Sequence, residues 1–220
     1  MSAPSLDVVA IVLAGGASSR FGSDKLAASL DGRPLLHHAL EAVASVADRI
    51  VVVIAPEAPS PPVPEALAAR VVVARDAAAH GGPLAGLAAG LAADVTPGRD
   101  EARRIAGVEG PGRIALVVGG DMPTLVPAVL RLLVERLAAD PALAAMTLAA
   151  SRPAPLPMAV RPAATRGAIE TILASGGRRS LLAPLEVVRS SVLAADDWRP
   201  LDPAGATLRD IDRPADLTVG

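Results

Sequence analysis

Short runs of Val and Ile alternate with stretches of helical spacing over the first 140 residues, and this alternation constrains the fold more than any other feature. Runs with almost no polar positions indicate strands that are buried on both faces, as in parallel sheets with crossover helices. The predicted strands cover residues 7–14, 49–55, 70–74 and 113–120. The pattern therefore predicts an α/β fold, with a mostly parallel sheet that is flanked by helices on both faces.

The segments between these strands have the spacing of amphipathic helices. Helices are predicted over residues 33–46, 82–94 and 127–140. The third has Leu and Val at i, i+3, i+4 spacing, with Arg131, Glu135 and Arg136 turned outward. Beyond residue 140 the pattern is less regular. It predicts strands near 144–150, 156–162 and 186–193, a helix over 164–175 and a short turn at 213–217.

Size and composition limit the class of protein. A chain of 220 residues with 51% hydrophobic residues can bury a full core, and we expect residues 1–220 to form a single domain. A net charge of −2 gives no basic field for nucleic acid, and the lack of Cys excludes disulfides and thiolate metal sites. The apolar run from Val8 to Ala14 is far shorter than the ~20 residues that span a bilayer. We expect a cytoplasmic protein without membrane contact, whose partners are small molecules or proteins.

The stretch LAGGASSRFGSDK, residues 13–25, directly follows the first predicted strand, at the sheet edge where such folds bind ligands. Adjacent glycines let backbone N–H groups converge on an anion, and Arg20 and Lys25 can neutralise phosphate charge. Lys25 is the only lysine among 21 Lys and Arg residues. An ammonium is a compact point charge where a guanidinium is a wide fork, so the lone Lys indicates a place where the fork does not fit. The alternative interpretation is that Lys25 is a surface lysine that survived by chance.

The spacing of the glycines narrows the kind of phosphate site. Gly15 and Gly16 are adjacent and the next glycine is Gly22, so the dinucleotide pattern G-x-G-x-x-G is absent. The Walker pattern fails as well, because five residues separate Gly16 from Gly22 and SDK follows. The loop therefore disfavours a hydride-transfer enzyme and a P-loop NTPase.

Four blocks together resemble the molybdenum cofactor guanylyltransferase family, the MobA-like nucleotidyltransferases. They are LAGGASSRFGSDK, GGPLAGL at 81–87, GGDMP at 119–123 and DIDRPADL at 210–217, in the order of the family. The resemblance implies a Rossmann-like, GT-A-like nucleotidyltransferase fold and an Mg²⁺-dependent transfer of GMP from GTP to molybdopterin, with release of pyrophosphate. It also implies transient contact with other proteins of molybdenum cofactor biosynthesis or with acceptor proteins. An in-line displacement of this kind depends on positioning and charge neutralisation.

The resemblance also implies a set of nucleotide contacts. The matching positions are Leu13, Ala14, Gly15, Gly16, Lys25, Asp76, Gly86 and Asp121. Arg20 and Lys25 match phosphate-contacting positions, and with Asp121 they are the expected catalytic residues. Asp76 follows the third strand, where the family has a nucleotide-contacting Asp, and Gly86 belongs to the turn that closes over the guanine. An ordinary loop carboxylate is the alternative reading of Asp76.

Two aspartates are the expected metal ligands. Asp121 directly follows the fourth strand and matches the metal-binding aspartate of the family, and Asp212 falls where related enzymes supply a second contact. A hard cation such as Mg²⁺ takes one or two carboxylates together with substrate phosphates. A structural alternative exists for each: Asp121 as a helix N-cap ahead of Pro123, and Asp212 as the cap of a last helix that starts at Pro214.

The chain departs from the family pattern in one place, since Ala55 and Pro56 stand where the family commonly has a nucleotide-contacting Asn. The segments expected to meet molybdopterin match only in outline. Within the nucleotidyltransferases, one alternative is a cytidylyltransferase for the same cofactor, which usually shows AAG and PK in the first loop. Another is a sugar-phosphate nucleotidyltransferase. A GTP-binding module without turnover is the alternative from another class, and the intact trio of Arg20, Lys25 and Asp121 argues against it.

Overall fold

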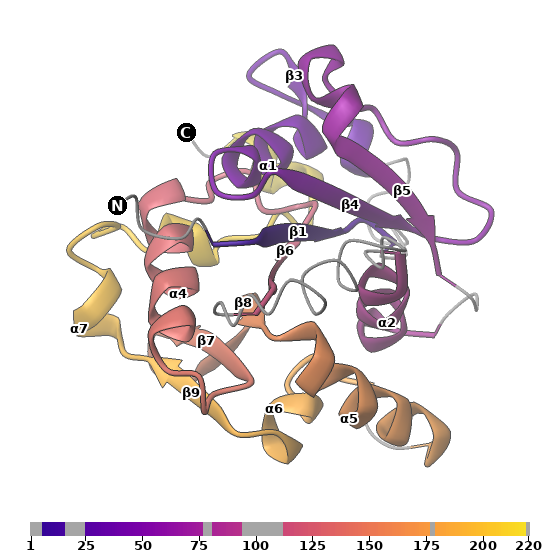
Figure 1. The fold of residues 1–220 in the computed structure, drawn as a ribbon. Coiled ribbons are helices and arrows are strands. Elements are labelled where there is room, and N and C mark those ends of the chain that lie inside the picture. Colours follow the sequence, from indigo (N-terminus) through magenta and orange to yellow (C-terminus); the bar gives the residue numbers. More distant parts are fainter. Residues whose placement is uncertain (1–5, 16–24, 77–80, 94–111, 177–178, 219–220) are drawn as a thin grey trace.

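The computed structural model describes residues 6–15, 25–76, 81–93, 112–176 and 179–218. Within these residues, seven strands form one sheet in the order β5-β4-β1-β6-β8-β7-β9 (Figure 1). The strands are β1 (Val8–Leu13), β4 (Arg49–Ile54), β5 (Val71–Arg75), β6 (Ile114–Gly119), β7 (Ala145–Ala149), β8 (Pro153–Val160) and β9 (Ser190–Leu193). Only β8 runs antiparallel to its neighbours, β6 and β7. The predicted mostly parallel sheet is therefore confirmed.

Helices cover both faces of the sheet, as predicted. The longer ones are α1 (Leu35–Ala44), α2 (Pro83–Ala93), α4 (Pro127–Ala139) and α5 (Pro162–Ala174). Alternate residues of β1 point to opposite faces: Ala10 and Val12 pack with α1 and α4, whereas Val9 and Ile11 pack with α2 and α5. The shorter helices are α6 (Ala183–Val187) and α7 (Ala195–Trp198). In the described part of the chain, none of the helices has the length and apolar character that crossing a bilayer requires.

Local elements differ from the sequence prediction in three places. The predicted helix over 33–46 starts only at Leu35, because residues 29–34 form a hairpin of β2 (Ser29–Leu30) and β3 (Arg33–Pro34). The turn residues of this hairpin, Asp31 and Gly32, both have positive φ, as a tight hairpin turn requires. The strand predicted over 186–193 is wrong in its first half, where α6 ends at Val187 and β9 starts at Ser190. The strand predicted over 156–162 already begins at Pro153, and Pro162 opens α5.

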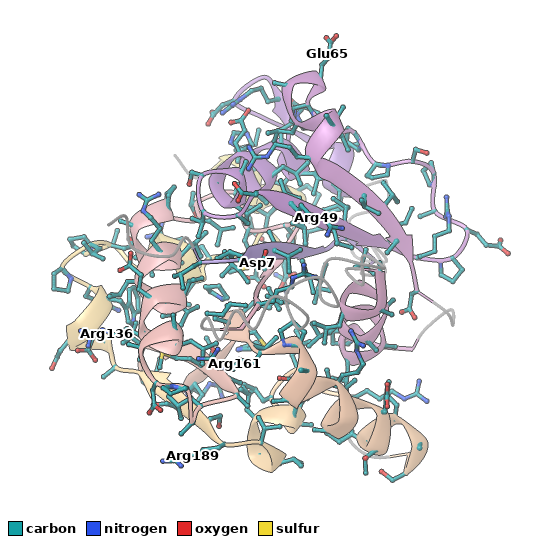
Figure 2. The ribbon with its side chains drawn as sticks, in the orientation of Figure 1. Asp7, Arg49, Glu65, Arg136, Arg161 and Arg189 are labelled. Carbon is teal, nitrogen blue, oxygen red and sulfur yellow. The ribbon has the colours of Figure 1, made fainter. Side chains whose placement is uncertain are left out.

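Arginines close the ends of helices with their forked side chains. Arg161 donates from Nη2 to Leu137 O at 2.8 Å, in the last turn of α4, and from Nε to Leu143 O at 2.9 Å, just past the end of this helix (Figure 2). Arg70 likewise donates from Nη2 to Ala44 O at 2.8 Å, at the end of α1. A helix leaves its last carbonyls without internal partners, and a planar fork can reach several of them at once.

Four 3₁₀ turns complete the described elements: η1 (Lys25–Ala27), η2 (Glu65–Arg70), η3 (Ala206–Leu208) and η4 (Pro214–Thr218). After β9 and α7 the chain forms η3 and then η4. Between these two turns, the amide of Ile211 donates to the carbonyl of Asp121 at 2.9 Å. The C-terminal segment therefore returns to the end of β6. This return brings Asp212 close to Asp121, which follows β6.

Candidate functional site

Four parallel strands end at one edge of the sheet, and backbone hydrogen bonds continue the pairing past their ends. The amide of Ala14 donates to Val53 O at 2.7 Å, and the amide of Gly120 donates to Leu13 O at 2.9 Å. These contacts hold the residues that follow β1, β4 and β6 side by side. The edge is the one where open α/β sheets bind ligands.

Lys25 lies at this edge, beside Asp121, which follows β6. Its Nζ donates to Asp121 Oδ2 at 2.8 Å and to Asp212 Oδ1 at 3.4 Å. The Lys25 side chain is 12% exposed, that of Asp121 32% and that of Asp212 59%. The fold thus brings together residues that are 96 and 187 positions apart in the sequence. This trio, Lys25, Asp121 and Asp212, is called the Lys–Asp cluster below.

The ionisation of the cluster follows from its geometry. Burial lowers the pKa of Lys25, but the hydrogen bonds and charges of Asp121 and Asp212 outweigh it, so the pKa of Lys25 is raised. Lys25 therefore keeps its positive charge at neutral pH. Burial and the charges of Asp212 and Asp121 raise the pKa of Asp210.

Asp210 is a third carboxylate at this site and was not among the predicted site residues. Its signal in the sequence is the motif DID, in which Asp210 and Asp212 are separated by one residue. The charges of Asp212 and Asp121 both act on the Asp210 carboxyl group and raise its pKa.

Gly119 makes room for the Asp121 carboxylate. A Cβ at position 119 would lie 2.5 Å from Asp121 Oδ1 and 3.2 Å from Met122 Cγ, so a larger residue would displace the carboxylate. The capping alternative for Asp121 is wrong, because α4 begins at Pro127 with Val126 as its N-cap residue. Instead, the Asp121 side chain accepts a hydrogen bond from Lys25.

The turn around Asp212 is held by another carboxylate. Asp216 Oδ2 accepts hydrogen bonds from the amides of Asp212 at 3.0 Å and Arg213 at 2.8 Å. This contact fixes the backbone at the start of η4. Asp212 is thereby held in a turn from which Oδ1 reaches Lys25.

Several predicted nucleotide contacts lie on the same edge. Ala14 is buried and Gly15 is exposed, and a Cβ on Gly15 would lie 3.3 Å from Ala55 N. The loop after β1 therefore passes close to the end of β4, where a side chain would crowd it. Asp76 is at the end of β5, where its amide donates to Ile54 O at 2.9 Å.

The remaining predicted contacts differ in their placement. Gly86 is buried in α2, and a Cβ there would meet Leu13 Cδ2 at 3.6 Å and Val53 Cγ1 at 3.8 Å. The Cβ direction of Gly86 therefore faces the sheet beneath α2. Gly16 and Arg20 lie outside the described residues.

Arg75, at the end of β5, reaches the loop after β4 that contains Ala55 and Pro56. Its Nη1 donates to Pro56 O at 2.7 Å, to Ala58 O at 2.9 Å and to Ala55 O at 3.3 Å. The loop after β4 is thus held from the end of β5 by one guanidinium. The sequence does not reveal this role, because the carbonyl groups that Arg75 reaches lie 17 to 20 residues away in the chain.

The Lys–Asp cluster has the donor chemistry of a divalent cation site. No group of three or more His, Cys, Asp or Glu residues in the described ranges has the geometry to hold a metal ion by itself. Asp121 and Asp212 nevertheless share one cation, the Lys25 ammonium. Mg²⁺ is usually held by one or two carboxylates plus substrate phosphates, so this pair fits it.

Known proteins resemble the chain over most of its length. It is 29% identical over 220 residues to a Chloroflexus aggregans protein named "Probable molybdenum cofactor guanylyltransferase", with 95% of this chain and 91% of that protein covered. A Pyrococcus horikoshii protein of the same name is 32% identical over 124 residues, which are 56% of this chain and 52% of the relative.

The fold is also similar to that of a solved structure. The molybdopterin-guanine dinucleotide biosynthesis protein A from Archaeoglobus fulgidus has a TM-score of 0.68 and 26% identity, with 96% of this chain and 94% of that chain covered. In addition, the sequence profile described as "MobA-like NTP transferase domain" matches residues 10–190, which include Lys25 and Asp121. The chain therefore belongs to the MobA-like NTP transferase family.

Proposed function

We propose that this protein is a molybdenum cofactor guanylyltransferase, which transfers GMP from GTP to molybdopterin and releases pyrophosphate. The observation that carries the proposal is the Lys–Asp cluster, in which Lys25 lies 2.8 Å from Asp121 and 3.4 Å from Asp212 at the carboxyl edge of the sheet. The names of the Chloroflexus and Archaeoglobus proteins support guanine as the base and molybdopterin as the acceptor.

In the proposed reaction a phosphate oxygen of molybdopterin attacks the α-phosphorus of GTP. The bond from that phosphorus to the oxygen bridging to the β-phosphate breaks, and pyrophosphate leaves. A phosphate monoester is already largely ionised at neutral pH, since its second pKa is about 6. The site therefore needs positive charge around the phosphates more than it needs a general base.

The residues of the cluster suit this requirement. Asp121 and Asp212 would hold Mg²⁺, which when bound offsets the negative charge of the phosphates. Lys25 remains protonated, because its carboxylate neighbours raise its pKa, and it acts as an electrostatic group. Arg20 is proposed as a second cation for the phosphates.

The rest of the edge is proposed to hold the nucleotide. The backbone of Leu13, Ala14, Gly15 and Gly16 would wrap the base and the phosphates. Asp76 and Gly86 are proposed as further contacts, at the ends of β5 and in the first turns of α2.

The proposal is tested by measuring pyrophosphate release with Mg²⁺, molybdopterin and GTP, CTP or ATP in parallel reactions. We expect release with GTP alone. Release with CTP alone would assign the protein to cytidylyl transfer, and no release by folded protein with any nucleotide would favour a binding module.

Asp121→Asn tests the role of the site directly. This variant should lower Mg²⁺-dependent release by about 100-fold or more, as loss of a group that stabilises transition-state charge does. Asp197→Asn is the matched control, because Asp197 is an exposed residue of α7. It should keep wild-type activity, and both variants should keep the wild-type circular dichroism spectrum.

A further inference from the structure

Asp202 is a buried carboxylate that the proposed reaction does not use. The residue is 4% exposed and lies beyond residue 190, where the match to the family profile ends. Its Oδ1 accepts a hydrogen bond from Ala206 N at 3.0 Å, and its Oδ2 accepts one from Thr207 N at 2.8 Å. A buried charge is costly unless it is fully hydrogen-bonded, so these backbone donors must stay in place.

The charge state of Asp202 agrees with this arrangement. Burial raises the pKa of Asp202, but hydrogen bonds from Thr207, Ala206 and Gly205 outweigh it and hold the pKa below its ordinary value. Both oxygens of an ionised carboxylate act as acceptors. An Asn at this position would keep one acceptor and place an NH₂ group against a backbone N–H.

The carboxylate fixes a compact turn. The amide of Gly205 donates to Asp202 O at 3.0 Å, and Gly205 has a φ of 65°. This left-handed conformation favours glycine, and η3 follows directly. The turn of residues 202–208 is therefore shaped around the Asp202 side chain.

The turn is docked onto the loop that carries Asp121. The hydroxyl of Thr124 donates to Ala206 O at 2.8 Å, and the amide of Val126 donates to Thr207 Oγ1 at 3.2 Å. Thr207 is fully buried, and its backbone amide donates to Asp202 Oδ2. A continuous path of hydrogen bonds thus runs from Asp202 through Thr207 to the loop after β6.

The same two segments meet again next to the cluster. Ile211, which stands between Asp210 and Asp212, donates from its amide to Asp121 O at 2.9 Å. Residues 202–211 and 121–126 are therefore linked at three points. The position of Asp212 relative to Asp121 depends on how these segments lie against each other.

We propose that Asp202, acting through Thr207, is a positioning residue that holds Asp212 opposite Asp121 in the candidate cation site. The inference rests on the proposed function for what the two aspartates bind. Partners beyond the first ligands of a metal commonly change its affinity by 10–100-fold when they are removed. Here the partner acts through the backbone, because it determines where the segment with Asp212 lies.

Four variants separate positioning from general stability. Asp202→Asn removes one acceptor of the turn, and Thr207→Val removes the hydroxyl that bonds to Val126. Trp198→Phe is the matched control: Trp198 is fully buried in the same C-terminal segment, but its Nε1 donates to Ala149 O at 3.0 Å, at the end of β7. Thr207→Ser keeps the hydroxyl and should restore what Thr207→Val loses.

The experiment measures Mn²⁺ affinity by electron paramagnetic resonance, steady-state kinetics of pyrophosphate release, and hydrogen exchange at the amide of Ile211. All are measured under conditions where urea titration shows each variant to be folded. Asp202→Asn and Thr207→Val should weaken Mn²⁺ binding by about tenfold or more, lower kcat, and speed exchange at Ile211. Trp198→Phe and Thr207→Ser should keep wild-type Mn²⁺ affinity.

Wild-type Mn²⁺ affinity in folded Asp202→Asn and Thr207→Val would overturn the positioning role and leave the proposed function intact. Equal weakening by Trp198→Phe would overturn it as well, because the effect would then follow from any loss of stability in the segment. Wild-type protein that neither binds Mn²⁺ nor releases pyrophosphate would contradict the proposed function. The positioning role would fail with it, even if Ile211 remained protected.

Discussion

Lys25 Nζ lies 2.8 Å from Asp121 Oδ2, and the same atom is 3.4 Å from Asp212 Oδ1. The only lysine of the chain is therefore the shared counter-ion of two carboxylates that belong to different loops. Two neighbouring carboxylates repel each other, so a cation between them stabilises the ionised pair. An ammonium suits this position because it can donate in several directions from one point, whereas a guanidinium is a planar fork.

Lys25→Met should make the protein bind divalent cations more tightly and turn over more slowly. The methionine keeps an unbranched stem but removes the ammonium that competes with a metal for the two carboxylates. We expect the Mn²⁺ dissociation constant of the nucleotide-free protein to fall several-fold, while kcat for pyrophosphate release falls by about 100-fold. Electron paramagnetic resonance of free Mn²⁺ measures the first quantity. Weaker Mn²⁺ binding in this variant would mean that the lysine helps to hold the metal.

Lys25→Arg separates charge from shape at the same position. The positive charge remains, but the fork must fit between carboxylates that now meet a single atom. We expect kcat to fall more than the affinity for nucleotide, because the loss concerns the developing charge. Rates like those of the wild type would show that any cation suffices at this position. The presence of the single lysine would then need no functional explanation.

The sheet could be predicted from the sequence because its signal is local. Buried parallel strands read as runs of Val and Ile, and the four runs did become β1, β4, β5 and β6, within one or two residues at each end. The elements that were missed depend on contacts or on single residues. The β2–β3 hairpin is only two residues long on each side. The strand predicted over 186–193 begins only at Ser190, because α6, with Pro184 in its first turn, extends to Val187.

The candidate site was predictable only where a motif carried it. Lys25 and Asp121 were found through the family blocks, and the structure brings them into contact. Asp202 was missed, although D-P-A-G at 202–205 is a turn signature, because nothing in a turn tells which loop it docks on. Arg75 was missed for the same reason, since its carbonyl partners lie 17 to 20 residues away.

Gly119→Ala should impair activity without unfolding the protein. The new methyl group would lie 2.5 Å from Asp121 Oδ1, so the carboxylate must move away from its place beside Lys25. A displacement of about 1 Å at a reacting site can lower the rate by about 100-fold, and we expect a loss of at least about tenfold in kcat/KM. The unfolding free energy should change by about 1 kcal/mol or less, because a partly exposed side chain can yield.

Gly167→Ala is the control for this substitution. Gly167 lies in α5, and nothing lies within 4 Å of its added Cβ. It should keep full activity and gain about 0.5–1 kcal/mol of stability from helix propensity. Wild-type kinetics in Gly119→Ala would show that the position of the Asp121 carboxylate is not critical.

Gly90→Ala and Gly86→Ala should differ in stability, although both glycines lie on α2. A Cβ at position 90 would meet Ile11 Cγ2 at 2.6 Å and Val53 Cγ2 at 3.0 Å, so the helix would be pushed off the sheet. Overpacking of this kind costs about 1–3 kcal/mol, which urea denaturation would detect. At position 86 the nearest atoms are 3.6 and 3.8 Å away, so we expect no loss of stability.

Gly86→Ala also tests the proposed nucleotide contact. A stable variant with weaker GTP binding, measured by calorimetry, would support a contact between the nucleotide and Gly86. Unchanged GTP affinity would leave Gly86 with only a packing role, at the contact of α2 with the sheet. Equal stability losses at positions 86 and 90 would contradict the packing argument for both.

Stability should fall as the pH decreases through the range where His37 titrates. Burial lowers the pKa of His37 from its ordinary value of 6.5, and among the described residues its Nε2 is a buried atom without a hydrogen-bond partner. Near and below about pH 6.5 the unfolded chain therefore binds more protons at this position than the folded protein, which favours unfolding. The unfolding free energy from urea titration should be lower at pH 5.5 than at pH 7.5. His37→Leu should reduce this difference, because it removes a group whose pKa is lower in the folded protein than in the unfolded chain. An unchanged difference would assign the pH dependence to other groups.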